Sequence, residues 1–306
     1  MLMESETPDI VAQARQTLSL MHDWGFAPTL PVLARDMLGG EVSTDSLEVA
    51  LRSPHVFQTT DGFVVLQGYE FLLENSKRRQ TSNRLLNGHA RAIAESFAER
   101  LATVCPYVQS VALSGSVASG GYQSGDDIDF DLFVRAGTKY VCYLAANLIG
   151  LTYSWRFRKA RSTTARLTFL LPKVICINVV WAEDESRPFV RQDAGMAFEL
   201  LRCQPIVGAY TFGQVLARNR WLFEFIPQLL KRTWVDTVNR GSSRIGSLLS
   251  GVGERPRALR LLNRACRIVS WALYTLVQAV RKGDAVARAR IDFLKTVKYP
   301  YEVFQD

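Results

Sequence analysis

The chain has 306 residues, of which 48% are hydrophobic and 22% are charged, enough to bury two or three modest cores. Its net charge of +8 favours polyanionic partners, and a nucleotide, a nucleic acid or an acidic membrane surface would each suit it. The five cysteines form no close pair and have no histidines nearby, which argues against a zinc site.

Three further features of the sequence bear on where the protein works. The first six residues are acidic and lack an apolar signal region. No apolar run reaches the roughly 20 residues that span a bilayer. Most cysteines lie in apolar runs, as expected of reduced core residues. The expectation is a cytoplasmic protein without a membrane span.

Residues 1–68 are predicted to form a winged-helix-like domain. Helices are expected over 10–21, 28–37 and 44–52, and either Ser43 or Thr44 can cap the third of them. Two short apolar runs then flank Asp61-Gly62, which is a strong hairpin signal. Three helices followed by a hairpin are typical of a winged helix.

The third helix of this domain would be the recognition helix if the domain bound DNA. It contains Asp45 and Glu48 and a single arginine, Arg52. Acidic side chains oppose phosphate contact, so a structural or protein-contact role is favoured over DNA binding.

Residues 69–104 are expected to form a long helical connector that ends before Pro106, and residues 105–190 a mixed core of strands and helices. In this core an apolar strand ends at Ser114, and a second strand covers 127–134. A helix is expected over 138–151, strand candidates over 152–155 and 166–171, and a strong strand over 174–181.

The second strand of the core carries three aspartates on one face. Asp127, Asp129 and Asp131 alternate with the apolar residues of the strand, so the period of two places the carboxylates together. Carboxylates in a row repel one another, and a fold would rarely keep them without a cation. Hard oxygen ligands suit Mg²⁺, which is commonly held by one or two carboxylates and by substrate phosphates.

A turn at Gly115-Ser116 closes the preceding strand, ten residues before Asp127. Such a turn offers backbone N–H groups and a hydroxyl to a phosphate. The pattern predicts a site for a metal-bound nucleoside triphosphate.

Gly-Ser, ten residues, and then Asp-hydrophobic-Asp resembles the signature of the nucleotidyltransferase superfamily typified by DNA polymerase beta. The resemblance implies that Gly115 and Ser116 contact the triphosphate. It also implies that Asp127 and Asp129 are catalytic ligands of two divalent ions, Mg²⁺ or Mn²⁺. An alternative register uses Asp129 and Asp131, although the lead-in from 124 to 127 favours the first.

The superfamily usually has a third carboxylate on a neighbouring strand, where this chain has Asn178. An amide carries no charge and cannot take a proton at neutral pH. Asp131, on the same face as the other two aspartates, is a candidate substitute metal ligand, and Glu183 and Asp184 lie just past the end of the neighbouring strand. Residues 173–181, with 202–208 and 219–221, also resemble a bacterial nucleotidyltransferase-domain family of undefined substrate. Asn is common at this point in that family, so Asn178 need not abolish activity.

Two lysines and one basic stretch are candidates for neutralising phosphate charge. Lys139 begins the helix after the aspartate strand, and Lys173 leads into the strand of Asn178. Arginines and a lysine gather between these strands and could guide a nucleic acid backbone: Arg156, Arg158, Lys159, Arg161 and Arg166.

Residues 191–306 read as a helical C-terminal region, with helices over 194–201, 212–217, 221–225 and 257–281. The expected fold class is therefore α+β: a winged-helix-like region, a central nucleotidyltransferase-fold mixed sheet with helices, and a helical C-terminal region. In the superfamily such a region often forms one wall of the substrate cleft.

The resemblance implies transfer of an NMP from an NTP, ATP among them, to a hydroxyl acceptor with release of pyrophosphate. The basic charge favours RNA or DNA as acceptor, and a protein acceptor also stays open. The main alternative is a weak or inactive nucleotide-binding regulator that acts through the winged helix. Two others are nucleotidylation of a cationic small molecule, which the basic stretch opposes, and synthesis of a second messenger or a toxin–antitoxin role.

Overall fold

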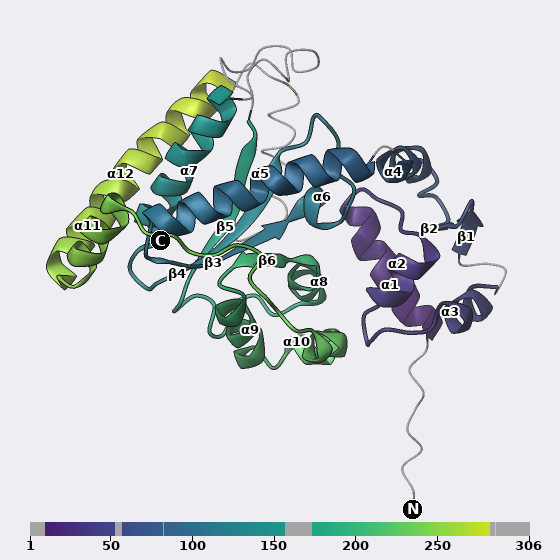
Figure 1. Ribbon diagram of the computed structural model, residues 1–306. Helices are drawn as coiled ribbons and strands as arrows, with labels where there is room; N and C mark the ends of the chain where they lie inside the picture. Colours follow the sequence, from purple (N-terminus) through teal and green to yellow (C-terminus); the bar gives the residue numbers. More distant parts are fainter. Residues whose placement is uncertain (1–9, 53–56, 82, 157–172, 282–284, 286–306) are drawn as a thin grey trace, which may run out of the picture. The chain divides into compact units, whose positions relative to one another are not determined.

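The computed structural model describes residues 10–52, 57–81, 83–156, 173–281 and 285, and it has a mixed α+β fold (Figure 1). The chain divides into two compact units, each built from separate stretches of sequence. The first unit comprises 1–83, 189–202 and 216–233, and the second comprises 84–188, 203–215 and 234–306. The sequence predicts four consecutive domains, over 1–68, 69–104, 105–190 and 191–306. That division stays a prediction.

The first unit consists of short helices and one hairpin. Its elements are α1 (Ile10–Asp23), α2 (Leu30–Arg35), α3 (Thr44–Leu51), β1 (Phe57–Thr60), β2 (Phe63–Leu66), α4 (Leu72–Thr81), α8 (Ala194–Arg202), the end of α9 (Ala209–Arg218), α10 (Leu222–Phe225) and the 3-10 helix η1 (Pro227–Lys231). Ser43 is the residue that caps α3, because its hydroxyl accepts from the backbone N–H of Ser46 at 3.0 Å.

The hairpin expected around Asp61-Gly62 is present. Strands β1 and β2 are antiparallel, and Thr60 lies opposite Phe63, which leaves a two-residue loop. Both loop residues have positive φ, 47° at Asp61 and 78° at Gly62, as a type I′ turn requires. Three helices followed by a hairpin thus agree with the expected order of elements, and a winged-helix arrangement remains a prediction.

A buried histidine in α1 should make the first unit sensitive to acid. His22 is 4% exposed, stacks on Tyr69 at 4.6 Å, and neither ring nitrogen has a hydrogen-bond partner in the described part of the chain. Burial lowers the pKa of His22 to about 4. An unfolded histidine takes a proton near pH 6.5, so the contribution of His22 to the free energy of unfolding should fall by up to about 3 kcal/mol as the pH drops from 6.5 to 4.

Urea unfolding across this pH range measures that loss. The variant His22→Phe keeps the ring stack and removes the titration, so its stability relative to that of the unaltered protein should rise by up to about 3 kcal/mol as the pH falls from 6.5 to 4. His89→Gln, at an exposed position, is the control and should keep the slope of the unaltered protein. An equal slope in His22→Phe would contradict the assignment to His22.

The second unit is built on a four-stranded mixed sheet in the order β5-β4-β3-β6 (Figure 1). Its strands are β3 (Val108–Ser114), β4 (Ile128–Val134), β5 (Ile175–Ala182) and β6 (Gln204–Val207). β4 and β5 are parallel, whereas β3 is antiparallel to both β4 and β6. The helices are α5 (Asn83–Val104), α6 (Gly115–Ala118), α7 (Lys139–Arg156), most of α9, α11 (Arg244–Gly253) and α12 (Pro256–Arg281).

The two faces of β4 have different neighbours, as the alternation predicts. Ile128, Phe130 and Leu132 are fully buried in the main core, where Phe130 packs on Phe97 of α5 at 4.7 Å. α7 packs on β5, and α12 packs on α7 (Figure 1). The opposite face of β4 therefore carries the aspartates.

Two elements differ in type from the sequence prediction. Residues 152–155, expected as a strand, form the last turns of α7, where Tyr153 packs on Phe97. The run Thr-Tyr-Ser-Trp suits a strand by propensity, but packing of the helix outweighs this weak preference. Residues 204–207 form the unpredicted edge strand β6, an edge being where a strand tolerates Pro205.

The remaining predictions fall partly outside the described residues. The strand candidate over 166–171 lies there, as do Arg158, Lys159, Arg161 and Arg166 of the basic stretch. The helical connector is two helices, α4 and α5, and α11 was not predicted. None of the helices in the described ranges is both long enough and apolar enough to cross a membrane.

Candidate metal centre

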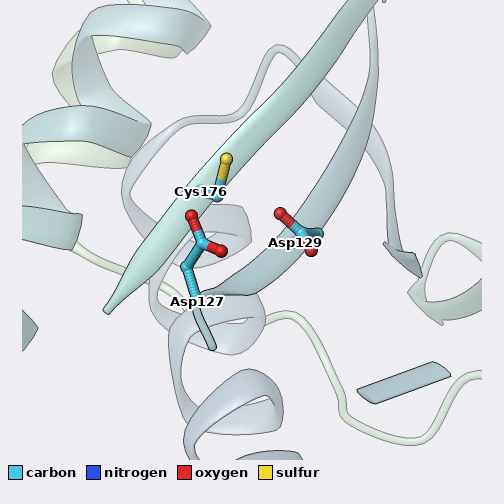
Figure 2. Close-up of side chains that lie close together, drawn as sticks. All are labelled: Asp127, Asp129 and Cys176. Carbon is cyan, nitrogen blue, oxygen red and sulfur yellow. The ribbon is translucent and has the colours of Figure 1, made fainter. Parts of the chain in front are cut away.

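Two carboxylates and a thiol converge where β4 and β5 begin (Figure 2). Asp127 directly precedes β4, Asp129 is its second residue, and Cys176 is the second residue of β5. One carboxylate oxygen from each aspartate and the Cys176 sulfur all lie within 4.8 Å of one another. All three residues belong to the second unit.

Strand register explains this convergence. β4 and β5 are parallel, so their first residues lie side by side, and Asp129 is paired with Cys176. The backbone N–H of Ile128 donates to the carbonyl of Val174 at 2.9 Å and holds this register. Period-2 alternation then turns Asp127, Asp129 and Cys176 toward the same face.

The Gly115-Ser116 turn lies directly against Asp129. Gly115 has a φ of +63°, and a Cβ at this position would lie 2.2 Å from Oδ2 of Asp129. Glycine is needed here both for its backbone conformation and for the close approach of the carboxylate. Ser116 is half-buried, and no hydrogen bond of its hydroxyl is found among the described residues.

Burial and charge repulsion both act on the aspartates. Burial, and then the neighbouring Asp127, raises the pKa of Asp129 to about 7. Without an ion, Asp129 therefore holds its proton close to neutral pH, because two adjacent carboxylates cannot both ionise cheaply. A divalent cation would reverse this preference by stabilising both charged forms.

A cationic side chain already contacts this group. The Lys173 ammonium lies 2.8 Å from Asp127 Oδ2 and 2.7 Å from Cys176 Sγ. An ammonium drawn to a carboxylate and a sulfur shows that the donor set attracts positive charge, so these residues fit a metal ion. The sequence predicts that Lys173 neutralises phosphate charge. Lys173 does lie at the site, but in the structure it contacts Asp127 and Cys176.

The structure does not bring Asp131 into the ligand group. Asp131 is completely buried, its Oδ1 accepts from the Ser114 hydroxyl at 3.1 Å, and its Oδ2 accepts from Cys203 Sγ at 3.3 Å. Burial raises the pKa of Asp131 to about 6. Asp131 lies on the predicted face of β4, two residues beyond Asp129. Hydrogen bonds from Ser114 and Cys203 occupy both of its carboxylate oxygens.

Asn178 lies beside the site rather than in it. Its Nδ2 donates to the Ser114 hydroxyl at 3.1 Å, and its Oδ1 accepts from Cys176 Sγ at 3.5 Å. The residue paired with Asp129 is Cys176, and a register shift farther along β4 and β5 falls at Asn178. Asn178 therefore supports Ser114, which in turn donates to Asp131.

Lys139 is not brought to this site. It begins α7, after the far end of β4, and its ammonium pairs with the Glu185 carboxylate at 2.8 and 3.0 Å. β4 is seven residues long, or about 20 Å, which separates Lys139 from Asp127. The ion pair indicates a structural role.

Cys176 is the site residue that sequence reasoning missed. In the sequence it sits in an apolar strand and resembles a core cysteine. A signal was present, because Cys176 and Asn178 are two residues apart and therefore share a face. The polar face of β5 carries a thiol as well as an amide.

Substitution of Asp131 tests whether this residue binds the metal ion directly or only supports the residues that do. Asp131→Asn should weaken Mn²⁺ binding by roughly ten- to a hundredfold, as for an outer-shell group, whereas Asp127→Asn should weaken it by more than about a hundredfold. Isothermal titration of both variants with Mn²⁺ measures the difference. Equal losses in the two variants would make Asp131 a ligand.

The site thus combines an acidic pair, a thiol and a glycine-serine turn on one edge of a mixed sheet. Comparisons with protein-family models, with curated proteins and with solved structures found no match to this chain.

Proposed function

We propose that the second unit is a metal-dependent nucleotidyltransferase, which moves an NMP from an NTP to a hydroxyl acceptor and releases pyrophosphate. The observation that carries this proposal is the Gly115-Ser116 turn packed against Asp129, with Asp127 beside it. The sequence signature of the nucleotidyltransferase superfamily supports it. The same proposal makes the protein cytoplasmic, where its free cysteines would stay reduced.

Each residue would have a definite task in this reaction. Asp127 and Asp129 would hold divalent ions, Mg²⁺ or Mn²⁺, which would polarise the α-phosphoryl group and stabilise the charge on the attacking and leaving oxygens. Ser116 would donate its hydroxyl to a phosphate oxygen, and Gly115 would let the chain approach the phosphates closely. Lys173 would turn from Asp127 toward the phosphate charge.

The transfer would be a single displacement at the α-phosphorus. The acceptor oxygen would form a bond to phosphorus, the bond to the bridging oxygen of the β-phosphate would break, and pyrophosphate would leave with that electron pair. The acceptor's proton would pass to solvent, since Asn178 cannot accept it.

The acceptor is proposed to be a nucleic acid or a protein.

In the first unit, Arg52 pairs with Glu48 at 3.3 Å, so the lone arginine at the end of α3 is partly neutralised. This contact favours a protein-binding role for the proposed winged helix over a DNA-binding one.

Transfer of label from α-labelled ATP, GTP, CTP and UTP tests the proposal. Purified protein, Mg²⁺ or Mn²⁺, and either total RNA or cell lysate would be incubated with each nucleotide. We expect label in one class of acceptor and release of pyrophosphate. Metal-dependent NTP binding without turnover, under all of these conditions, would contradict an enzymatic function.

A second function is favoured by one observation: the ligand group found in the described residues has two carboxylates and no third. The protein would then bind a nucleotide without turning it over and would signal occupancy through the first unit. Cys176→Asp, which places a third carboxylate beside Asp127 and Asp129, discriminates the two proposals. Gain of transfer from an inactive protein would favour the regulator, whereas activity in the unaltered protein would remove it.

A further inference from the structure

The third donor atom of the site is sulfur, whereas a Mg²⁺ site takes oxygen ligands. Cys176 Sγ lies within 4.8 Å of one oxygen from each of Asp127 and Asp129. Figure 2 shows the thiol on β5 and the two carboxylates at β4, with their donor atoms close to one another.

We propose that Asp127, Asp129 and Cys176 form a thiolate-containing site that takes a thiophilic divalent ion, such as Zn²⁺ or Co²⁺, in preference to Mg²⁺. This inference rests on the proposed function, because it uses the same two carboxylates, Asp127 and Asp129. It adds Cys176 as a third ligand and names the class of metal ion that the site selects.

Donor chemistry supports this selection. Mg²⁺ takes oxygen ligands almost exclusively, so Cys176 would add nothing to its binding. Thiolates bind Zn²⁺ and Co²⁺ well, and carboxylates complete their coordination shells. Ligand atoms around a tetrahedral Zn²⁺ lie about 3.6 Å apart, a spacing that small side-chain rotations could reach from the present one.

The protonation change balances without another reactant. The thiol of Cys176 would release its proton to solvent as the metal–sulfur bond forms, with no change in oxidation state. Lys173, which contacts Cys176 at 2.7 Å, has a half-exposed side chain and can turn outward as the ion enters. One cation then replaces another beside the same donor atoms.

Other cysteines of the second unit have different surroundings. Cys203 donates to Asp131, and Cys105 lies 3.6 Å from Cys142 inside the core. Within the described ranges, Cys176 is the cysteine whose sulfur falls in a group with two carboxylates. Half-buried Cys266, on α12, is therefore a suitable control position.

Titration with Co²⁺ tests the proposal, because a cobalt–thiolate bond gives a near-ultraviolet charge-transfer band. The full-length protein, Cys176→Ser and Cys266→Ser would be compared, with Mg²⁺ competition in each case. We expect the band in the unaltered protein and in Cys266→Ser, and its loss in Cys176→Ser. Cobalt affinity should fall at least about tenfold in Cys176→Ser, while Mg²⁺ affinity stays unchanged.

Absence of the band, or its survival in Cys176→Ser, would overturn the proposal, and so would displacement of Co²⁺ by an equal concentration of Mg²⁺. Nucleotidyl transfer with Mg²⁺ is assayed on the same proteins. If Cys176→Ser transfers label normally and no band is seen, the proposed function stands and the thiolate site fails. If a Cys176-dependent band is seen but no protein transfers label, the thiolate site stands and the function fails.

Discussion

Asp129→Asn should abolish nucleotidyl transfer and at the same time make the ion-free protein more stable to heat. The activity should fall by roughly a thousandfold or more, because an amide cannot hold the ion that neutralises the developing charge. The stability should rise because the substitution removes one of two neighbouring carboxylates in a partly buried site.

The gain in stability should depend on pH in a defined way. The pKa of Asp129 is raised to about 7 in the folded protein, whereas an unfolded aspartate titrates near 3.8. The unfolded state therefore loses its proton first, and the contribution of Asp129 to the stability of the unaltered protein falls as the pH rises from about 4 to about 7. The advantage of Asp129→Asn should be full above pH 7, at about 1–3 kcal/mol, and absent below pH 4.

Calorimetry in a chelating buffer at pH 4 and pH 8 measures the stability, and label transfer with Mn²⁺ measures the activity. Asp184→Asn is the matched control, since Asp184 is an exposed carboxylate on the turn after β5. It should change neither quantity. An Asp129→Asn protein that is less stable at pH 8, or that keeps its activity, would contradict this account of the site.

Gly115→Ala should reduce transfer by roughly a hundredfold without unfolding the protein. The new methyl group would lie 2.2 Å from Asp129 Oδ2, so the carboxylate must move by about 1 Å, which is enough to cost this factor. The φ of +63° adds a backbone cost of about 1–2 kcal/mol.

Gly120→Ala separates the collision from the backbone cost. Gly120 has a φ of +75°, and its added Cβ would meet nothing within 4 Å. Both variants should lose similar stability through the strained backbone, but only Gly115→Ala should lose affinity for Mn²⁺ and transfer activity. Equal activities in the two variants would show that the approach of Gly115 to Asp129 does not matter.

The sequence predicts best those features that depend on local pattern. Alternation along 127–134 placed Phe130 in the core and Asp129 on the opposite face, as found. The hairpin at Asp61-Gly62 followed from turn chemistry, because both residues tolerate positive φ.

Features that depend on register between strands could not be predicted in this way. Pairing of Asp129 with Cys176 follows from where β5 aligns with β4, and this alignment leaves Asn178 outside the ligand group. The sequence of one strand does not by itself specify the register in which a neighbouring strand pairs with it. The alternation predicts the correct face for Asp131. Its hydrogen bonds with Ser114 and Cys203, which keep it out of the ligand group, depend on packing between strands.

Helix length was also misjudged where propensity and packing disagreed. Residues 152–155 continue α7 because Tyr153 fills a space beside Phe97 and its hydroxyl meets Ser96 at 2.9 Å. These contacts join segments more than fifty residues apart, so no local window reveals them.

Release of pyrophosphate during transfer from an α-labelled nucleotide is the measurement that tests the central claim most directly. The unaltered protein would be compared with the double variant Asp127→Asn, Asp129→Asn, with and without a divalent ion. The account predicts transfer with equimolar pyrophosphate from the unaltered protein only when the ion is present, and none from the double variant. Equal release from both proteins would contradict the claim that Asp127 and Asp129 form a catalytic metal centre.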